Sequence, residues 1–240
     1  MTDSQLNKRE EDIQKLIAGG CHLGGKNCTK QMMKYVWDKK SSGVYMFNVQ
    51  KQFEKIQAAA RIIASIPDPS TITAVSGRLY GQRAVYKFSK YTKSVCVTGR
   101  WTPGMLTNQN TKTFVEPRLL ILTDPRIDYN ALLESSYVNI PIIALCNTDN
   151  NLQYVDCAIP CNNRSKKSLA MIYWLLTREV LALKGELEEG QFNELPDLFM
   201  YRNVEKKEEK TEEEAAKEEE GAEDEKEDEG EENFIEEEAS

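Results

Sequence analysis

Short polar groups follow the apolar runs of this 240-residue chain, and they contain residue types that bind ligands or transfer protons. Carboxylates, amides and hydroxyls at the carboxyl ends of parallel strands form the active sites of many α/β enzymes. One interpretation is therefore an enzyme. The other is that these groups cap helices and satisfy one another at the rim of a sheet. The groups are Asn48, Ser76-Gly77-Arg78, Gly99-Arg100, Thr123-Asp124, Asn147-Thr148-Asp149 and Asn162-Asn163.

The sequence favours the second interpretation. Neither of the glycine patterns that bind nucleotides, G-x-G-x-x-G and G-x-x-x-x-G-K-[ST], occurs in the chain. His22, the only histidine, lies outside the predicted strand ends, and no partner base can be assigned to Asp124 or Asp149. We therefore predict no catalytic site, no cofactor and no small-molecule substrate.

A first anion site is predicted at Ser76-Gly-Arg-Leu-Tyr-Gly-Gln-Arg83, a glycine-containing turn that runs into a helix. Backbone N–H groups and the positive end of the helix dipole attract phosphate at such a position. Three cations of that helix share one face, at positions i, i+4 and i+7, and a solvated helix face is the alternative interpretation. The basic residues of this turn, of its helix and of the next strand end are Arg78, Arg83, Lys87, Lys90 and Arg100.

A second anion site is predicted at Asn162-Asn-Arg-Ser-Lys-Lys167, where the last long helix begins. The cations Arg164, Lys166 and Lys167 crowd the positive end of a helix dipole, which disfavours folding by about 0.3–1 kcal/mol each when no anion is bound. The alternative is that Asn163 or Ser165 caps the helix while the cations point into solvent. We favour the anion site.

Alternating strands and helices must position these groups. Leu119–Leu122 and Ile140–Cys146 are continuous apolar runs, typical of strands covered on both faces, and Asp128 is placed to cap a helix between them. This βαβ order predicts a doubly wound α/β sheet. The other predicted strands are Val44–Val49, Ile72–Val75, Val95–Thr98 and a short edge strand, Asp156–Ile159. The other predicted helices are Ser4–Ala18, Gln50–Ser65, Gly81–Tyr91 and Asn163–Lys184.

Charge divides the chain into two parts. Residues 203–240 hold 5 lysines and 20 acidic residues, a net charge of −15. Of the chain's 31 basic and 39 acidic residues, 26 basic and 19 acidic remain in residues 1–202, a net charge of +7. We predict a basic α/β domain over residues 1–202, suited to a polyanion, and a disordered acidic tail over residues 203–240.

The six cysteines are predicted to be free thiols, because no secretory signal precedes them and a reducing compartment is expected. They are Cys21, Cys28, Cys96, Cys146, Cys157 and Cys161. A metal set of Cys157, Cys161 and His22 lacks the paired short spacings of structural zinc sites, so no metal is predicted. No apolar run approaches the roughly 18 residues of a membrane span.

Two motifs carry a resemblance to a known family. Leu16-Ile-Ala-Gly-Gly-Cys-His-Leu-Gly24 resembles its first signature. The stretch from Pro117 to Asp149 resembles its second, with matches at Pro117, Asp124, Asp128, Leu132, Glu134, Asn139, Ile140 and Pro141. The family is that of ribosomal protein SA, the eukaryotic and archaeal counterpart of bacterial ribosomal protein S-two, also called the laminin-receptor-precursor family. The short connection from Thr107 to Pro117 and the acidic tail resemble eukaryotic members.

The resemblance implies a flavodoxin-like, mainly parallel sheet with no catalytic role. It also implies a structural part of the small ribosomal subunit near the head–body junction, with a role in late subunit maturation. The implied partners are ribosomal RNA and neighbouring ribosomal proteins, and the implied location is the cytoplasmic ribosome, with a transient nuclear stage during assembly. The basic residues given above are then candidate RNA-binding residues.

Two departures from animal members weaken a second role, laminin binding at the cell surface. The tail lacks the tryptophan-containing acidic repeats of those members, and the helix segment linked with laminin is altered to Leu169-Ala-Met-Ile-Tyr-Trp-Leu-Leu176. A cell-surface laminin-binding protein and an α/β enzyme remain the alternatives. The charge division suggests that the tail competes with stray RNA for the basic domain before assembly.

Overall fold

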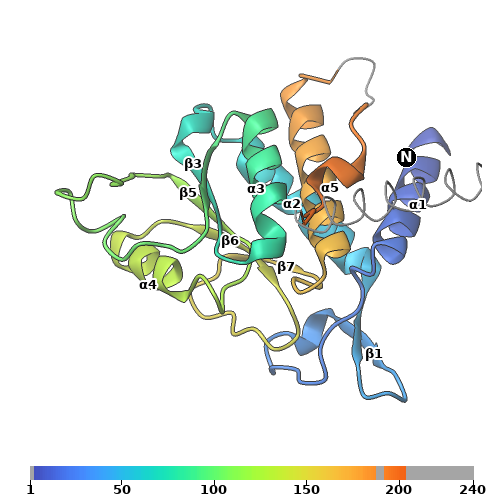
Figure 1. Ribbon diagram of the computed structural model, residues 1–240. Coiled ribbons are helices and arrows are strands. Elements are labelled where there is room, and N and C mark those ends of the chain that lie inside the picture. The colour runs from blue at the N-terminus through green and yellow to red at the C-terminus, as the bar shows by residue number, and fades with distance from the viewer. Residues whose placement is uncertain (1–2, 188–191, 204–240) are drawn as a thin grey trace, which may run out of the picture. The chain divides into compact units, whose positions relative to one another are not determined.

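Five strands form a parallel sheet in the computed structural model, which describes residues 3–187 and 192–203 (Figure 1). The strand order is β4-β3-β5-β6-β7, the order of flavodoxin-like folds, and the predicted fold class is confirmed. Every pairing between neighbours in this sheet is parallel. The strands are β3 (Ile72–Ser76), β4 (Val95–Thr98), β5 (Leu119–Leu122), β6 (Ile142–Cys146) and β7 (Cys157–Pro160).

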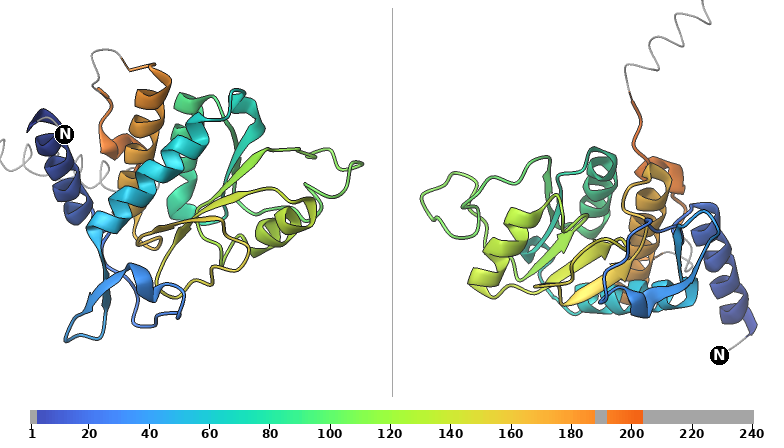
Figure 2. Two further views of the ribbon diagram at one scale, coloured as in Figure 1. Left: turned by 180° about the vertical axis from the view of Figure 1, so that it is seen from behind. Right: turned by 90° about the horizontal axis from the view of Figure 1, so that it is seen from below.

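Three helices cover one face of the sheet. In Figures 1 and 2, α2, α3 and α5 form one group, and α4 lies apart from them. The α-helices are α1 (Asp3–Ala18), α2 (Val49–Ala64), α3 (Leu79–Thr92), α4 (Tyr129–Val138) and α5 (Lys166–Lys184). Short 3-10 helices occupy Met33–Tyr35, Pro69–Thr71 and Pro196–Phe199.

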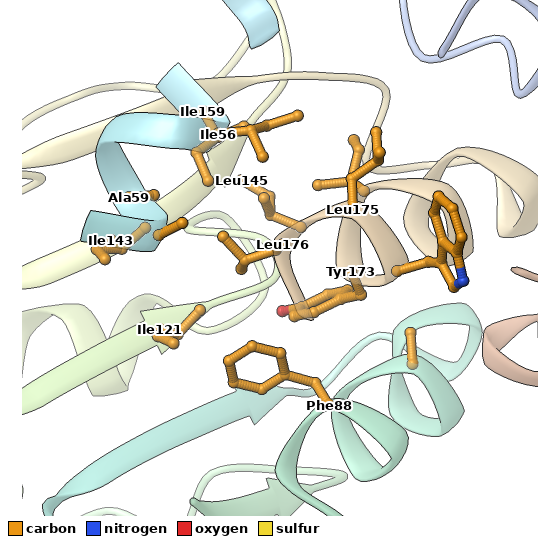
Figure 3. Close-up of a cluster of buried hydrophobic side chains, with 14 of the residues drawn as sticks. Ile56, Ala59, Phe88, Ile121, Ile143, Leu145, Ile159, Tyr173, Leu175 and Leu176 are labelled. Carbon is orange, nitrogen blue, oxygen red and sulfur yellow. The ribbon is translucent and has the colours of Figure 1, made fainter. Parts of the chain in front are cut away.

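The core on this face is built from alternate strand residues and the inner sides of α2, α3 and α5 (Figure 3). Tyr173 of α5 lies at its centre, fully buried, with its ring edge-on to Phe88 at a centroid distance of 5.9 Å. Its hydroxyl forms a 2.8 Å hydrogen bond with Thr123 Oγ1, so the one polar atom of this ring is satisfied. Burying each large side chain of such a core contributes about 1.5–3 kcal/mol.

The opposite face is covered by α4, by the N-terminal segment that buries Met32 and Tyr35, and by the connection between β4 and β5. The connection from Gly99 to Arg118 carries no helix, and it buries Trp101, Met105 and Leu106 against the sheet before extending past its edge (Figure 2). Glu134 of α4 holds this connection, because its carboxylate accepts hydrogen bonds from the backbone N–H groups of Gly104 at 2.8 Å and Leu106 at 3.2 Å. Glu134 is itself buried.

The prediction that Val44–Val49 is the first strand of the main sheet is wrong. Its centre, β2 (Tyr45–Phe47), pairs antiparallel with β1 (Val36–Lys39) in a separate two-stranded sheet, and β1 was not predicted. Asn48 therefore follows β2 and not a strand of the main sheet. It caps α2, and its side-chain oxygen accepts hydrogen bonds from the N–H groups of Gln50 at 3.0 Å and Lys51 at 3.2 Å.

Other boundaries differ by a few residues. The last long helix begins at Lys166 rather than at Asn163, because Asn163 is buried and bonded to the ends of the strands. The six cysteines are free thiols. Within the part of the chain that the structure describes, no helix is long and apolar enough to cross a bilayer. Apart from Asn203, the predicted acidic tail lies outside the described residues.

Glu134→Ala is expected to lower the free energy of unfolding by about 2–4 kcal/mol, because two backbone donors lose their acceptor in a largely buried site. Urea unfolding monitored by circular dichroism measures the change. Ser136→Ala, on the same helix but with a local hydrogen bond to Leu133, is the control. Equal stability losses in the two variants would contradict the role given to Glu134.

Candidate nucleic-acid interface

All five strands of the main sheet end at one edge because they are parallel. We call the residues that follow them there the carboxyl rim, which comprises residues 76–78, 99–100, 123–128, 147–150 and 161–165. The three helices that follow strands, α3, α4 and α5, begin at this edge, so the positive ends of their dipoles meet there. None of these helices has an acidic residue in its first turn.

Arg78 and Asp124 form an ion pair at the centre of the rim. The distance from Arg78 Nη2 to Asp124 Oδ2 is 2.5 Å, and the Arg78 side chain is only 23% exposed. The other oxygen of Asp124 accepts hydrogen bonds from Asn150 Nδ2 at 2.9 Å and from the N–H of Arg126 at 3.0 Å. Arg78 was predicted to face RNA, but this pair turns its guanidinium inward to the protein.

Asp128 lies beside this pair and does not cap α4 with its side chain as predicted. Its Oδ1 accepts a 2.9 Å hydrogen bond from the N–H of Gly77, on the neighbouring strand end. Its Oδ2 is buried and has no hydrogen-bond partner among the described residues. Burial, reinforced by the Asp124 charge, raises the pKa of the Asp128 carboxyl to about 6, although the Gly77 N–H and Arg78 oppose the shift.

These bonds close the place where an α/β sheet of this kind holds a ligand. In flavodoxin-like folds that place is the crevice between the two central strand ends from which the chain departs in opposite directions, here β3 and β5. The Arg78–Asp124 pair fills it, and a Cβ atom at Gly77 would lie 2.6 Å from Asp128 Oδ1. The first predicted anion site therefore has no free Gly77 amide, since the Gly77 N–H already donates its hydrogen bond to Asp128.

The polar residues after β6 and β7 also satisfy one another. Asn147 and Asn163 are buried and joined by a 3.4 Å hydrogen bond, and Asn163 donates to the carbonyl of Leu145. The backbone N–H of Asn147 donates to Asn150 Oδ1 at 3.2 Å. At these strand ends, the interpretation that polar groups stabilise the rim is confirmed.

The three predicted cations of α3 do not act as one exposed stripe. Arg83 is half-buried, and its Nε donates a 3.0 Å hydrogen bond to the carbonyl of Leu198, which fixes the C-terminal segment on α3. Lys87 is half-buried and Lys90 is exposed in the last turn, far from the rim. Arg100 is exposed and follows Gly99, whose φ of +99° turns the chain away from β4.

The second predicted anion site keeps its exposed cations. Arg164, Lys166 and Lys167 are all exposed at the start of α5, and the side chain of the N-cap residue, Ser165, forms no capping hydrogen bond. The first-turn N–H groups thus lack a side-chain acceptor from the cap. Arg164 also donates to Asp149 Oδ2 at 2.5 Å. This end of α5 has the charge and the donors that bind a phosphate.

Two further sets of cations, which were not predicted from the sequence, lie near the rim. Arg126, whose side chain is 71% exposed, shares Asp149 Oδ2 with Arg164 at a distance of 3.0 Å. The signal for Arg126 was its place directly after the Asp124-Pro125 strand end. The second set lies in the N-terminal segment that bonds to Thr148 through Gly25 and Thr29. All of its lysines are exposed: Lys26, Lys30, Lys34, Lys39 and Lys40.

The glycine-framed turn around His22 is a packing device. A Cβ atom at Gly24 would lie 2.5 Å from the Thr148 side chain and 3.0 Å from the Tyr45 carbonyl, so only glycine permits this approach of the N-terminal segment to β6. The pKa of His22 is lowered, mainly by burial and also by the charge of Lys40. No nucleophile or base pairs with its side chain among the described residues.

Comparison with known proteins gives one consistent family. A family model described as Ribosomal protein S2 matches residues 16–114 and 111–182. The chain is 50% identical over 204 residues to small ribosomal subunit protein uS2 of Yarrowia lipolytica, covering 84% of this chain and 76% of that protein. It is 51% identical over 208 residues to small ribosomal subunit protein uS2 of Hydra viridissima, covering 85% of this chain and 71% of that protein.

Asp128→Asn is expected to stabilise the fold increasingly as the pH rises from about 4 to above 6. The folded pKa of Asp128 is about 6 and its ordinary value is 3.8, so the wild type loses about 3 kcal/mol of stability across this window as the buried carboxyl ionises. Asparagine keeps an acceptor for Gly77 and stays neutral. Urea unfolding at several pH values measures the difference, with the exposed Asp68→Asn as the control. A difference from wild type that does not change with pH would contradict the assignment.

Proposed function

Because the chain belongs to the ribosomal protein S2 family, of the eukaryotic SA/uS2 type, we propose that it is a structural constituent of the small ribosomal subunit that binds ribosomal RNA. We further propose contacts with neighbouring ribosomal proteins near the head–body junction, and a requirement for the protein in subunit assembly and maturation. It acts in the cytoplasmic ribosome, after a transient nuclear stage during assembly. The relatives compared above are named as ribosomal subunit proteins, and the chain is not an enzyme.

The observation that carries this proposal is the position of the exposed cations. Residues 1–202 have a net charge of +7, and exposed basic side chains gather at and beside the carboxyl rim. Cations that neutralise phosphates release the counterions of RNA, which drives association. The RNA-binding surface proposed here consists of Arg100, Arg126, Arg164, Lys166, Lys167 and the exposed lysines of residues 26–40.

The originally predicted RNA-binding set is revised on this basis. Arg78 and Arg83 have structural partners, Asp124 and the Leu198 carbonyl, so we assign them to the stability of the domain. Lys87 and Lys90 remain candidates for a separate contact along α3. The enzyme alternative receives no such support, because the ligand crevice of the sheet is filled by protein side chains.

Reversal of the α5 charges by Arg164→Glu, Lys166→Glu and Lys167→Glu is expected to weaken association with small subunits at least about tenfold and to reduce its salt dependence. Sedimentation in sucrose gradients at several salt concentrations measures both effects. The matched control reverses Arg61, Lys93 and Arg118, which are exposed at the opposite edge of the sheet, near the ends of α2 and α3 and the start of β5. Wild-type occupancy of subunits by the α5 variant would refute this binding surface.

Removal of residues 203–240 is expected to raise the affinity of the free protein for unrelated RNA severalfold, because 20 carboxylates no longer compete with phosphate for the basic domain. Filter binding of a non-ribosomal RNA at low salt measures this affinity. A variant that replaces the segment with an uncharged sequence of equal length separates charge from length. Unchanged RNA affinity in both variants would rule out competition by the tail.

A further inference from the structure

A pocket of about 360 Å³ lies beside the carboxyl rim, between the start of α4 and the chain that follows β6. Its walls include Tyr129 and Leu132 from α4 and Tyr154 from the connection to β7. Leu132 is buried and provides an apolar floor, whereas Tyr129 and Tyr154 are 51% and 48% exposed. The pocket therefore presents aromatic rings to solvent beside an apolar surface.

The backbone of Tyr154 adopts a left-handed conformation, which places its ring at the pocket. Its φ is +64°, in the left-handed region that costs a residue with a side chain about 1–2 kcal/mol. The neighbouring side chains Asn151 and Gln153 are exposed and also line the pocket. Amide side chains both donate and accept hydrogen bonds, and the edges of unpaired RNA bases require both.

Two guanidinium groups flank the pocket. Arg126 lines it, and Arg164 joins Arg126 through the shared oxygen of Asp149, which is a lining residue as well. Their side chains are 71% and 55% exposed, and one carboxylate oxygen engages only a part of the five donors of each guanidinium. The flank keeps a net positive charge and suits a phosphate, whereas an apolar peptide would leave these donors without a partner.

We propose that this pocket binds one unpaired nucleotide of ribosomal RNA. The base stacks on Tyr129 or Tyr154 over Leu132, the amides of Asn151 and Gln153 contact its edge, and its phosphate lies against Arg126 and Arg164. Stacking of splayed-out bases on tyrosine is a common mode of recognition of single-stranded RNA. This inference rests on the proposed function and adds a base-binding site to a surface that otherwise contacts only phosphate.

The test uses the full chain inside small subunits. Tyr154 is replaced by the photo-crosslinking residue benzoylphenylalanine, the subunits are purified and irradiated, and the cross-linked partner is identified. Cross-linking to a single unpaired nucleotide of the RNA is expected. The same replacement at Tyr137, which is 72% exposed on α4 but does not line the pocket, is the control and is not expected to label that nucleotide.

A second measurement uses chemical probing of that nucleotide in subunits that carry Tyr129→Ala or Tyr154→Asn. Asparagine tolerates the left-handed backbone, so this variant removes the ring without adding strain. Base reactivity should rise at least about fivefold in both variants and stay unchanged in Tyr137→Ala.

A cross-link from position 154 to protein only, or unchanged base reactivity, would overturn the nucleotide pocket. In either case, continued sedimentation of the chain with small subunits would leave the proposed ribosomal function standing. Failure of the wild-type chain to sediment with subunits would instead overturn the proposed function itself.

Discussion

The buried carboxylate of Asp124 is the group around which the carboxyl rim is organised. It receives hydrogen bonds from residues that follow three different strands: Arg78 after β3, Arg126 after β5 and Asn150 after β6. A buried charge that loses its partner destabilises a protein by about 3–5 kcal/mol, so each of these segments is held in place. The same bonds fill the crevice between β3 and β5. The crevice that binds ligands in related folds therefore stabilises the sheet in this chain.

The basic surface follows from strand direction as much as from composition. Parallel strands bring the starts of α3, α4 and α5 to one edge, and the first turns of these helices lack acidic residues. Dipole ends and exposed cations therefore reinforce one another there, with Asp149 as the rim carboxylate that two arginines share. At the opposite edge, cations such as Lys184 face negative helix ends and are stabilised without an anion.

Apolar patterning predicted the strands and helices of the main sheet because buried strands need continuous apolar runs and amphipathic helices repeat every 3.6 residues. It could not assign a pairing partner, so Val44–Val49 was placed in the wrong sheet. The direction in which a side chain points could not be predicted from the sequence either. Arg78 and Arg126 both follow strand ends, yet one is drawn inward by Asp124 and the other is exposed. The pocket between Tyr129 and Tyr154 is lined by residues 25 positions apart in the sequence, so no local sequence pattern could predict it.

The residues that revealed the family are mostly not those that would touch RNA. Asp124 and Asp128 close the rim, Glu134 holds the connection before β5, and Asn139 ends α4 with a φ of +58° that few residues adopt. Each of these residues can fill its structural role only at its own position and with its own hydrogen bonds or backbone conformation. A phosphate, by contrast, can be met by a flexible cation at many points of the same edge. Motifs in such a protein therefore report the scaffold, and the binding residues emerge only when the fold shows which cations share a surface.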